Sequence, residues 1–154
     1  MDKGLTRRRT LASGAAALAT GAVFPGLAEA AVGAPAAAEA AMKKFTGGKT
    51  PAKGAIKLTL PQIAENGNTV PLSVSVESPM TPASYVQEIR VFVTRNPLPV
   101  AVTFLFTPES GKASAATHIR LAATQDVSAV ARMSDGTFLI DTRNCKVTIG
   151  GCGG

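Results

Sequence analysis

The sequence predicts an all-β fold, an antiparallel β-sandwich with one short N-terminal helix and a flexible, glycine-rich C-terminal arm. From residue 56 onward apolar and polar residues alternate with period two, which is the pattern of half-buried strands. Turn-forming residues interrupt the alternation repeatedly. Seven or eight short strands in about 95 residues are typical of a sandwich with Ig-like architecture. The chain has no Trp, and its two cysteines do not have antibody-domain spacing.

The expected strands follow one another with short connections. The alternation predicts them at residues 56–60, 70–77, 89–94, 100–106, 115–121, 127–133, 138–140 and 145–149. Turn residues separate several of these segments, at 66–68, 96–99, 110–111 and 134–136. We therefore expect one sandwich domain over residues 55–149.

Residues 31–54 form the expected helix and linker before the sandwich. Pro35 suits the first turn of a helix, and Gly47 with Gly48 suits its end. The sequence predicts an amphipathic helix over 35–46. Four apolar residues at helical spacing form its core-facing side, namely Ala38, Ala41, Met42 and Phe45.

Residues 1–30 have the organisation of an export signal. A basic cluster at Arg7–Arg9 precedes a weakly apolar, Ala/Gly-rich stretch and a small-x-small site at Ala28–Ala30. Tandem arginines followed by Thr10 and Leu11 resemble a twin-arginine signal, and an ordinary Sec signal or an N-terminal anchor is the alternative. We expect cleavage near residue 30 and a periplasmic mature protein, in a compartment where thiols are open to oxidation.

The mature composition excludes two classes of function. Without residues 1–30 the chain keeps 12 basic and 8 acidic residues, a net charge of +4. These charges form no basic stripe and few aromatic residues accompany them, which argues against nucleic-acid binding. No run of 18 apolar residues follows the leader, so the sequence predicts no membrane span after it.

The sequence offers almost nothing for catalysis. His118 is the only histidine, and the alternation places it on a strand surface. The sequence contains no zinc-protease, serine-hydrolase, phosphate-loop or Cys-x-x-Cys motif. Two cysteines and one histidine are too few for a convincing metal site, so we expect no metal and no cofactor.

Two apolar residues break the alternation. Phe92 and Leu105 both lie on the polar faces of their strands. If the two strands pair, these side chains form an exposed apolar patch, which is a candidate protein–protein interface. The alternative is that the helix at 35–46 covers them.

The C-terminus carries the strongest chemical signal. Cys152 stands between Gly150–Gly151 and Gly153–Gly154, directly after the last expected strand. Glycine lacks a Cβ, so this segment is conformationally free and narrow. Three extended residues span at most about 10 Å, enough to place a thiol in a partner's cleft. Cys152 is therefore the candidate nucleophile, and the enzyme that receives the arm would activate it.

The second cysteine is expected to be inert. Cys145 has the parity of Val147 and Ile149, which directs it into the core, where a cysteine behaves as a small apolar residue. A disulfide between Cys145 and Cys152 is the alternative and would lock the arm. It requires Cα atoms within about 7 Å and thus a folded-back arm.

These features resemble the SoxY family of sulfur-carrier proteins of periplasmic thiosulfate oxidation. The resemblance rests on the export signal, the sandwich and the terminal Gly-Gly-Cys-Gly-Gly. It extends to three internal stretches, ENGNTVPL at 65–72, VESPMT at 76–81 and IRLAATQ at 119–125. Cys145 has no counterpart in the motif of that family.

The resemblance implies a carrier rather than an enzyme. Cys152 would hold the sulfur intermediates covalently, with Gly150, Gly151, Gly153 and Gly154 as the flexible arm. The implied partners are a SoxZ-like β-sandwich subunit in a heterodimer, a c-type cytochrome enzyme that conjugates thiosulfate, and a metal-dependent hydrolase that releases sulfate. A sulfane dehydrogenase is a further partner in some hosts. Phe92 and Leu105 are the candidate contacts with the SoxZ-like subunit.

Two other functions compete with this hypothesis. One is a secreted β-sandwich interaction module whose terminal cysteine forms a structural disulfide, and the other is thiol-based metal handling. The flanking glycines argue against the first, because a structural disulfide gains nothing from a flexible segment without side chains. The scarcity of Cys and His argues against the second.

Overall fold

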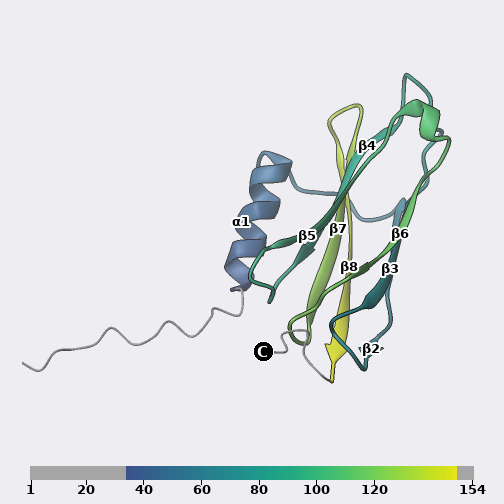
Figure 1. The fold of residues 1–154 in the computed structure, drawn as a ribbon. Helices are drawn as coiled ribbons and strands as arrows, with labels where there is room; N and C mark the ends of the chain where they lie inside the picture. Colours follow the sequence, from purple (N-terminus) through teal and green to yellow (C-terminus); the bar gives the residue numbers. More distant parts are fainter. Residues whose placement is uncertain (1–33, 149–154) are drawn as a thin grey trace, which may run out of the picture.

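The computed structural model describes residues 34–148 (Figure 1). The expected export signal and the expected arm lie outside the described residues, at 1–33 and 149–154, and both stay predictions. Within the described part, no helix is long and apolar enough to cross a membrane.

The helix predicted over residues 35–46 is confirmed as α1, Pro35–Thr46. Pro35 stands at the start, where its missing N–H is not needed for helical hydrogen bonding. Gly47 ends the helix in the left-handed conformation, at φ 61°, which glycine adopts without steric cost. Lys43 and Lys44 lie in the last turn, where positive charge is favoured by the helix dipole.

Eight strands follow α1, and they form two sheets with a shared core (Figure 1). One sheet has the order β1-β3-β6, and the other has the order β2-β8-β7-β4-β5. A short 3₁₀ turn at Pro108–Ser110 joins β5 to β6. The predicted β-sandwich is thereby confirmed. The strands are β1 Ile56–Thr59, β2 Ile63–Ala64, β3 Val70–Val76, β4 Val86–Val93, β5 Val100–Leu105, β6 Ala113–Ile119, β7 Gln125–Met133 and β8 Phe138–Val147.

The last strand differs from the prediction. The alternation predicts two short strands at 138–140 and 145–149, but β8 is one continuous strand. Polar residues from Asp141 to Asn144 interrupt the apolar pattern, yet each pairs with a residue of β7. The Asp141 carboxylate also accepts a hydrogen bond from the Leu58 N–H of β1 at 2.9 Å. A polar stretch is tolerated here because it lies at the side of the sandwich, where a neighbouring strand satisfies it.

The sequence does not predict β2, and β2 changes the topology. Its two residues, Ile63 and Ala64, pair in parallel with Lys146 and Val147 at the end of β8. The other strand pairs are antiparallel in the described structure. The predicted antiparallel sandwich therefore needs one correction, a short parallel contact at its C-terminal end.

Helix α1 covers the outer face of the five-stranded sheet (Figure 1). Phe45 packs against Phe92 and Phe138, with ring centroids 6.0 Å and 5.5 Å apart. The Phe45 ring also lies under the Arg90 guanidinium, 4.4 Å from its centroid. This contact between helix and sheet forms a second, smaller apolar cluster outside the sandwich core.

The prediction of one exposed patch at Phe92 and Leu105 is wrong for Phe92. Phe92 is 1% exposed because α1 covers it, which was the alternative, whereas Leu105 is 76% exposed. The two residues lie apart along the β4–β5 ladder, where Phe92 pairs with Val100 and Leu105 pairs with Glu88. Leu105 alone stays a candidate contact residue.

Candidate functional site

The described residues that directly precede the candidate arm are the end of β8 and Thr148. Lys146 N–H donates to Gln62 O at 2.8 Å, and Thr148 N–H donates to Ala64 O at 3.1 Å. The Thr148 hydroxyl donates to Glu65 O at 3.1 Å. The segment that contains β2 is therefore hydrogen-bonded to the chain directly before the expected arm, on one side of it.

Thr124 hydrogen-bonds the end of β8 from the opposite side. Its hydroxyl oxygen accepts the Val147 N–H at 2.9 Å and donates to Val147 O at 3.4 Å. Three residues earlier along β8, the Asn144 amide donates to the Asp126 carboxylate at 2.8 Å. We call residues 146–148, with Glu65 and Thr124, the arm root. It is bonded on both sides, so the arm would leave the sandwich from a fixed position.

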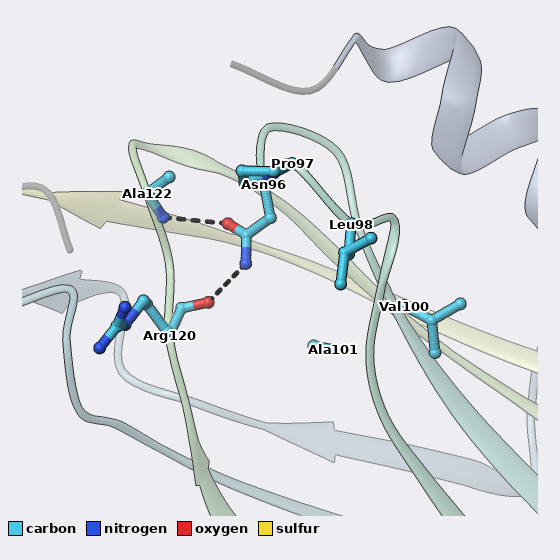
Figure 2. Close-up of a pocket in the computed structure, with 7 residues that line it drawn as sticks. All are labelled: Asn96, Pro97, Leu98, Val100, Ala101, Arg120 and Ala122. Carbon is cyan, nitrogen blue, oxygen red and sulfur yellow. Dashed lines mark hydrogen bonds between the residues drawn. The ribbon is translucent and has the colours of Figure 1, made fainter. Parts of the chain in front are cut away.

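A side-chain network organises the loops next to the arm root (Figure 2). The Asn96 amide donates to Arg120 O at 2.7 Å and its oxygen accepts the Ala122 N–H at 3.0 Å. The buried Gln125 amide also donates to the Asn96 oxygen, at 2.8 Å, and Gln125 accepts the Arg95 N–H at 2.7 Å. The loop after β4 and the loop after β6 are thereby tied together.

A pocket of about 310 Å³ opens beside this network (Figure 2). Leu98 and Val100 contribute apolar side chains to the pocket. In Figure 2 the Arg120 side chain lies on the other side of the lining residues from them. Ala122, at its edge, is two residues from Thr124 of the arm root. The end of the sandwich that carries the arm root is thus hollowed, mainly apolar and bordered by one cation. The lining residues are Asn96, Pro97, Leu98, Val100, Ala101, Arg120 and Ala122.

Cys145 occupies the position predicted for it. The residue is 0% exposed, and its free thiol lies in the core between the sheets. Burial raises the pKa of the Cys145 thiol, because a thiolate would lose its hydration there. A neutral, inaccessible thiol is a poor nucleophile. The inward position also gives no support to a bridge with Cys152, which lies outside the described residues.

His118 lies on the surface of β6, opposite Pro71 of β3, and its predicted outward position is confirmed. Among residues 34–148 no three His, Cys, Asp or Glu side chains come close enough to hold a metal ion. The candidate site residues of the arm, Cys152 with Gly150, Gly151, Gly153 and Gly154, are outside the described part.

Sequence reasoning missed the arm root. Thr124 and Glu65 belong to the stretches 119–125 and 65–72, which carry part of the resemblance to a known family. The structure brings both stretches to the end of β8, although Glu65 is 83 residues from Thr148 and Thr124 is 23 residues from Val147 along the chain. The resemblance was the available signal, because no local pattern indicates which strand a loop hydroxyl will bond.

Comparison with known proteins identifies the class. The family model described as "Sulfur oxidation protein SoxY" matches residues 42–152. Among solved structures, the sulfur carrier protein SoxY from Chlorobium limicola f thiosulfatophilum matches with a TM-score of 0.60 and 28% sequence identity. The match covers 74% of this chain and 98% of that one. The comparison with curated proteins finds no match.

Superoxide reductases share the fold at lower identity. Neelaredoxin from Ignicoccus hospitalis matches with a TM-score of 0.55 and 16% identity, over 61% of this chain and 80% of that one. The superoxide reductase from Nanoarchaeum equitans matches with a TM-score of 0.52 and 9% identity, over 62% of this chain and 99% of that one. At such identities the likeness concerns the sandwich alone.

Fold and family together define a small all-β carrier protein of sulfur oxidation, not an enzyme. The chain belongs to the SoxY family, whose model matches it from within α1 to Cys152.

Proposed function

We propose that this protein carries intermediates of thiosulfate oxidation covalently on the Cys152 thiol. The observation that carries the proposal is the family match, which extends through the C-terminal segment to Cys152. The burial of Cys145 supports it, because the chain then has a single cysteine available for chemistry. The hydrogen-bonded arm root supports it further, since a carrier cysteine needs a fixed attachment point on the domain and a flexible segment around the thiol.

The chemistry on Cys152 runs through two partner enzymes, and through a third in hosts that have it. In the first step the Cys152 sulfur joins the sulfane sulfur of thiosulfate. The thiol proton leaves, and two electrons pass to a c-type cytochrome enzyme. In the second step water attacks the terminal sulfonate sulfur, a metal-dependent hydrolase releases sulfate, and a persulfide stays on Cys152. A sulfane dehydrogenase, where the host has one, then oxidises the outer persulfide sulfur to a sulfonate: three water molecules supply the oxygens and six electrons pass to that enzyme. The hydrolase releases this sulfonate as a second sulfate.

The glycines define how the cargo is presented. Gly150, Gly151, Gly153 and Gly154 remove side chains on both sides of Cys152, so that the tip fits a narrow active site. Thr124 and Glu65 fix the point from which the arm extends. Each partner enzyme then meets the same short tether at the same end of the sandwich.

We place this function in the periplasm, after export of the folded protein by the twin-arginine route. The basic cluster, apolar stretch and small-x-small site of residues 1–30 support this placement. We further propose a SoxZ-like β-sandwich subunit as the partner in a heterodimer. Leu105, which is exposed on the edge strand β5, is the candidate contact.

A loading experiment tests the proposal. Purified protein is incubated with thiosulfate and the cytochrome enzyme of the same host, and adducts are measured by intact mass. Cys152→Ser should abolish loading and leave the circular dichroism spectrum unchanged. Cys145→Ala, the matched control, should load as the wild-type protein does. Loading of the Cys152→Ser variant, or loss of loading in Cys145→Ala with an intact fold, would contradict the proposal.

A further inference from the structure

A groove runs along the side of the sandwich where β1 of one sheet faces β8 of the other. Two adjoining hollows, of about 450 Å³ and about 600 Å³, form it. Lys57 and Arg143 line both of them, so the hollows are continuous. The groove contains the polar stretch 141–144, which interrupts the apolar pattern of β8. We call this surface the β1–β8 groove.

One end of the β1–β8 groove lies at the arm root. Gln62 lines this end, and its carbonyl oxygen accepts the N–H of Lys146, an arm-root residue, at 2.8 Å. Asn144 lines the same end and stands two residues before Lys146 along β8. Beside the opposite end, Ala55 accepts the Glu77 N–H at 2.8 Å, but the Glu77 side chain does not line the groove. A molecule held in the groove would therefore adjoin the point where the expected arm begins.

The lining of the groove is basic. Three cations contribute to it, Lys53, Lys57 and Arg143, and one carboxylate accompanies them, that of Asp141. This carboxylate already accepts the Leu58 N–H at 2.9 Å and an Arg143 N–H at 3.3 Å. The Arg143 side chain is 57% exposed and has further N–H donors that can bind a carboxylate. The lining has an excess of two positive charges, half of the net +4 of the chain without residues 1–30, and so favours an acidic ligand.

The β8 wall of the groove also offers backbone donors. Ile140 N–H donates to Ala52 O at 2.9 Å, on the edge of β8 that points away from β7. Because bonding directions alternate along an antiparallel strand, the N–H groups of Thr142 and Asn144 point to the same edge. β2 covers that edge only from Lys146 onward. Within residues 34–148 no strand covers the short stretch between, so these two N–H groups can donate to a carboxylate on a bound loop.

We propose that the β1–β8 groove is the docking surface for an acidic segment of the enzymes that receive the Cys152 arm. Carboxylates of that segment pair with the three lining cations and accept the two N–H groups of β8. The occupant is a protein segment because the two hollows are too large for one small oxyanion to fill. The proposal rests on the proposed function, since it concerns the enzymes that act on Cys152. Exposed charges of this kind speed encounter and are screened by salt, so the complex is short-lived, as a carrier that visits several enzymes requires.

Loading kinetics with the cytochrome enzyme, with the carrier as the varied substrate, test the proposal. The double variant Lys53→Glu/Lys57→Glu should raise the KM for the carrier at least about tenfold and change kcat less than about twofold. Both side chains are exposed, so the circular dichroism spectrum should stay unchanged. Lys44→Glu/Lys112→Glu is the matched control, with the same change of net charge at two exposed residues outside the groove. It should load with the KM of the wild-type protein.

Amide hydrogen exchange provides a second readout that needs no loading. In the Cys152→Ser carrier, exchange at the backbone amides of Thr142 and Asn144 should slow at least about threefold when the cytochrome enzyme is added. Unchanged exchange at both amides would overturn the proposal. So would an unchanged KM in the groove variant, an equal rise in the control variant, or a rise in the KM for thiosulfate in place of that for the carrier. Failure of the wild-type protein to load Cys152 at any concentration would instead contradict the proposed function.

Discussion

The hydroxyl of Thr124 should hold the end of β8, and Thr124→Val tests this role. Valine keeps the branched shape and removes the oxygen that bonds Val147. The lost interactions are the bond from Val147 N–H at 2.9 Å and the longer bond to Val147 O at 3.4 Å. Thr124 itself is exposed, so the substitution leaves no cavity in the core.

The expected magnitude follows from these two bonds. A hydrogen bond contributes a net ~0.5–1.5 kcal/mol, and the longer bond lies at the low end of that range. The end of β8 should therefore lose about 1–2 kcal/mol of local stability. Because 1.4 kcal/mol corresponds to a factor of ten, amide exchange at Val147 should accelerate about five- to thirty-fold.

Amide hydrogen exchange measured by NMR at Val147 provides the assay. Thr124→Ser keeps the hydroxyl and should restore slow exchange. Thr69→Val is the matched control, since the exposed Thr69 hydroxyl makes none of the hydrogen bonds described in the structure. Unchanged exchange in Thr124→Val, or equal acceleration in Thr69→Val, would refute the role of Thr124 in the arm root.

Two further outcomes are expected. Phe45→Ala should lower the free energy of unfolding in urea by about 2–3 kcal/mol, somewhat less than for a fully buried Phe, because the ring contacts Phe92 and Phe138 but stays partly exposed. Leu98→Ala, at a mostly exposed side chain, should cost less than about 0.5 kcal/mol, and equal losses in the two variants would contradict the packing of α1. Burial raises the pKa of Cys145, so its contribution to stability is present below the ordinary thiol pKa of about 8.5 and is lost as the pH rises through the folded-state value. The difference in unfolding free energy between wild type and Cys145→Ala should shrink above pH ~8.5, and a difference that grows there would contradict the burial argument.

Period-two patterning predicted much of the sandwich, because several strands bury one face, whereas β4 and β7 are largely buried on both. The strand at 70–76 shows the rule, with Val70, Leu72, Val74 and Val76 buried and the intervening residues not. The alternation correctly placed Phe92 on the face of its strand that points away from the sandwich core. It could not show that α1 lies on that face, since the contact joins residues far apart in sequence.

The arm root shows a different limit. β2 has two residues, too few to produce any period, and its pairing with Lys146 and Val147 is set by the fold. The bond of Thr124 to Val147 likewise depends on tertiary placement. In contrast, the inward position of Cys145 was predicted because it lies on a strand with clear parity.

Intact mass of the protein exported by cells grown on thiosulfate, localised to the C-terminal peptide, tests the carrier role most directly. The carrier role requires several reductant-sensitive sulfur adducts on Cys152 and none on Cys145. A single species lighter by two thiol hydrogens, with Cys145 and Cys152 in one bridged peptide, would contradict it.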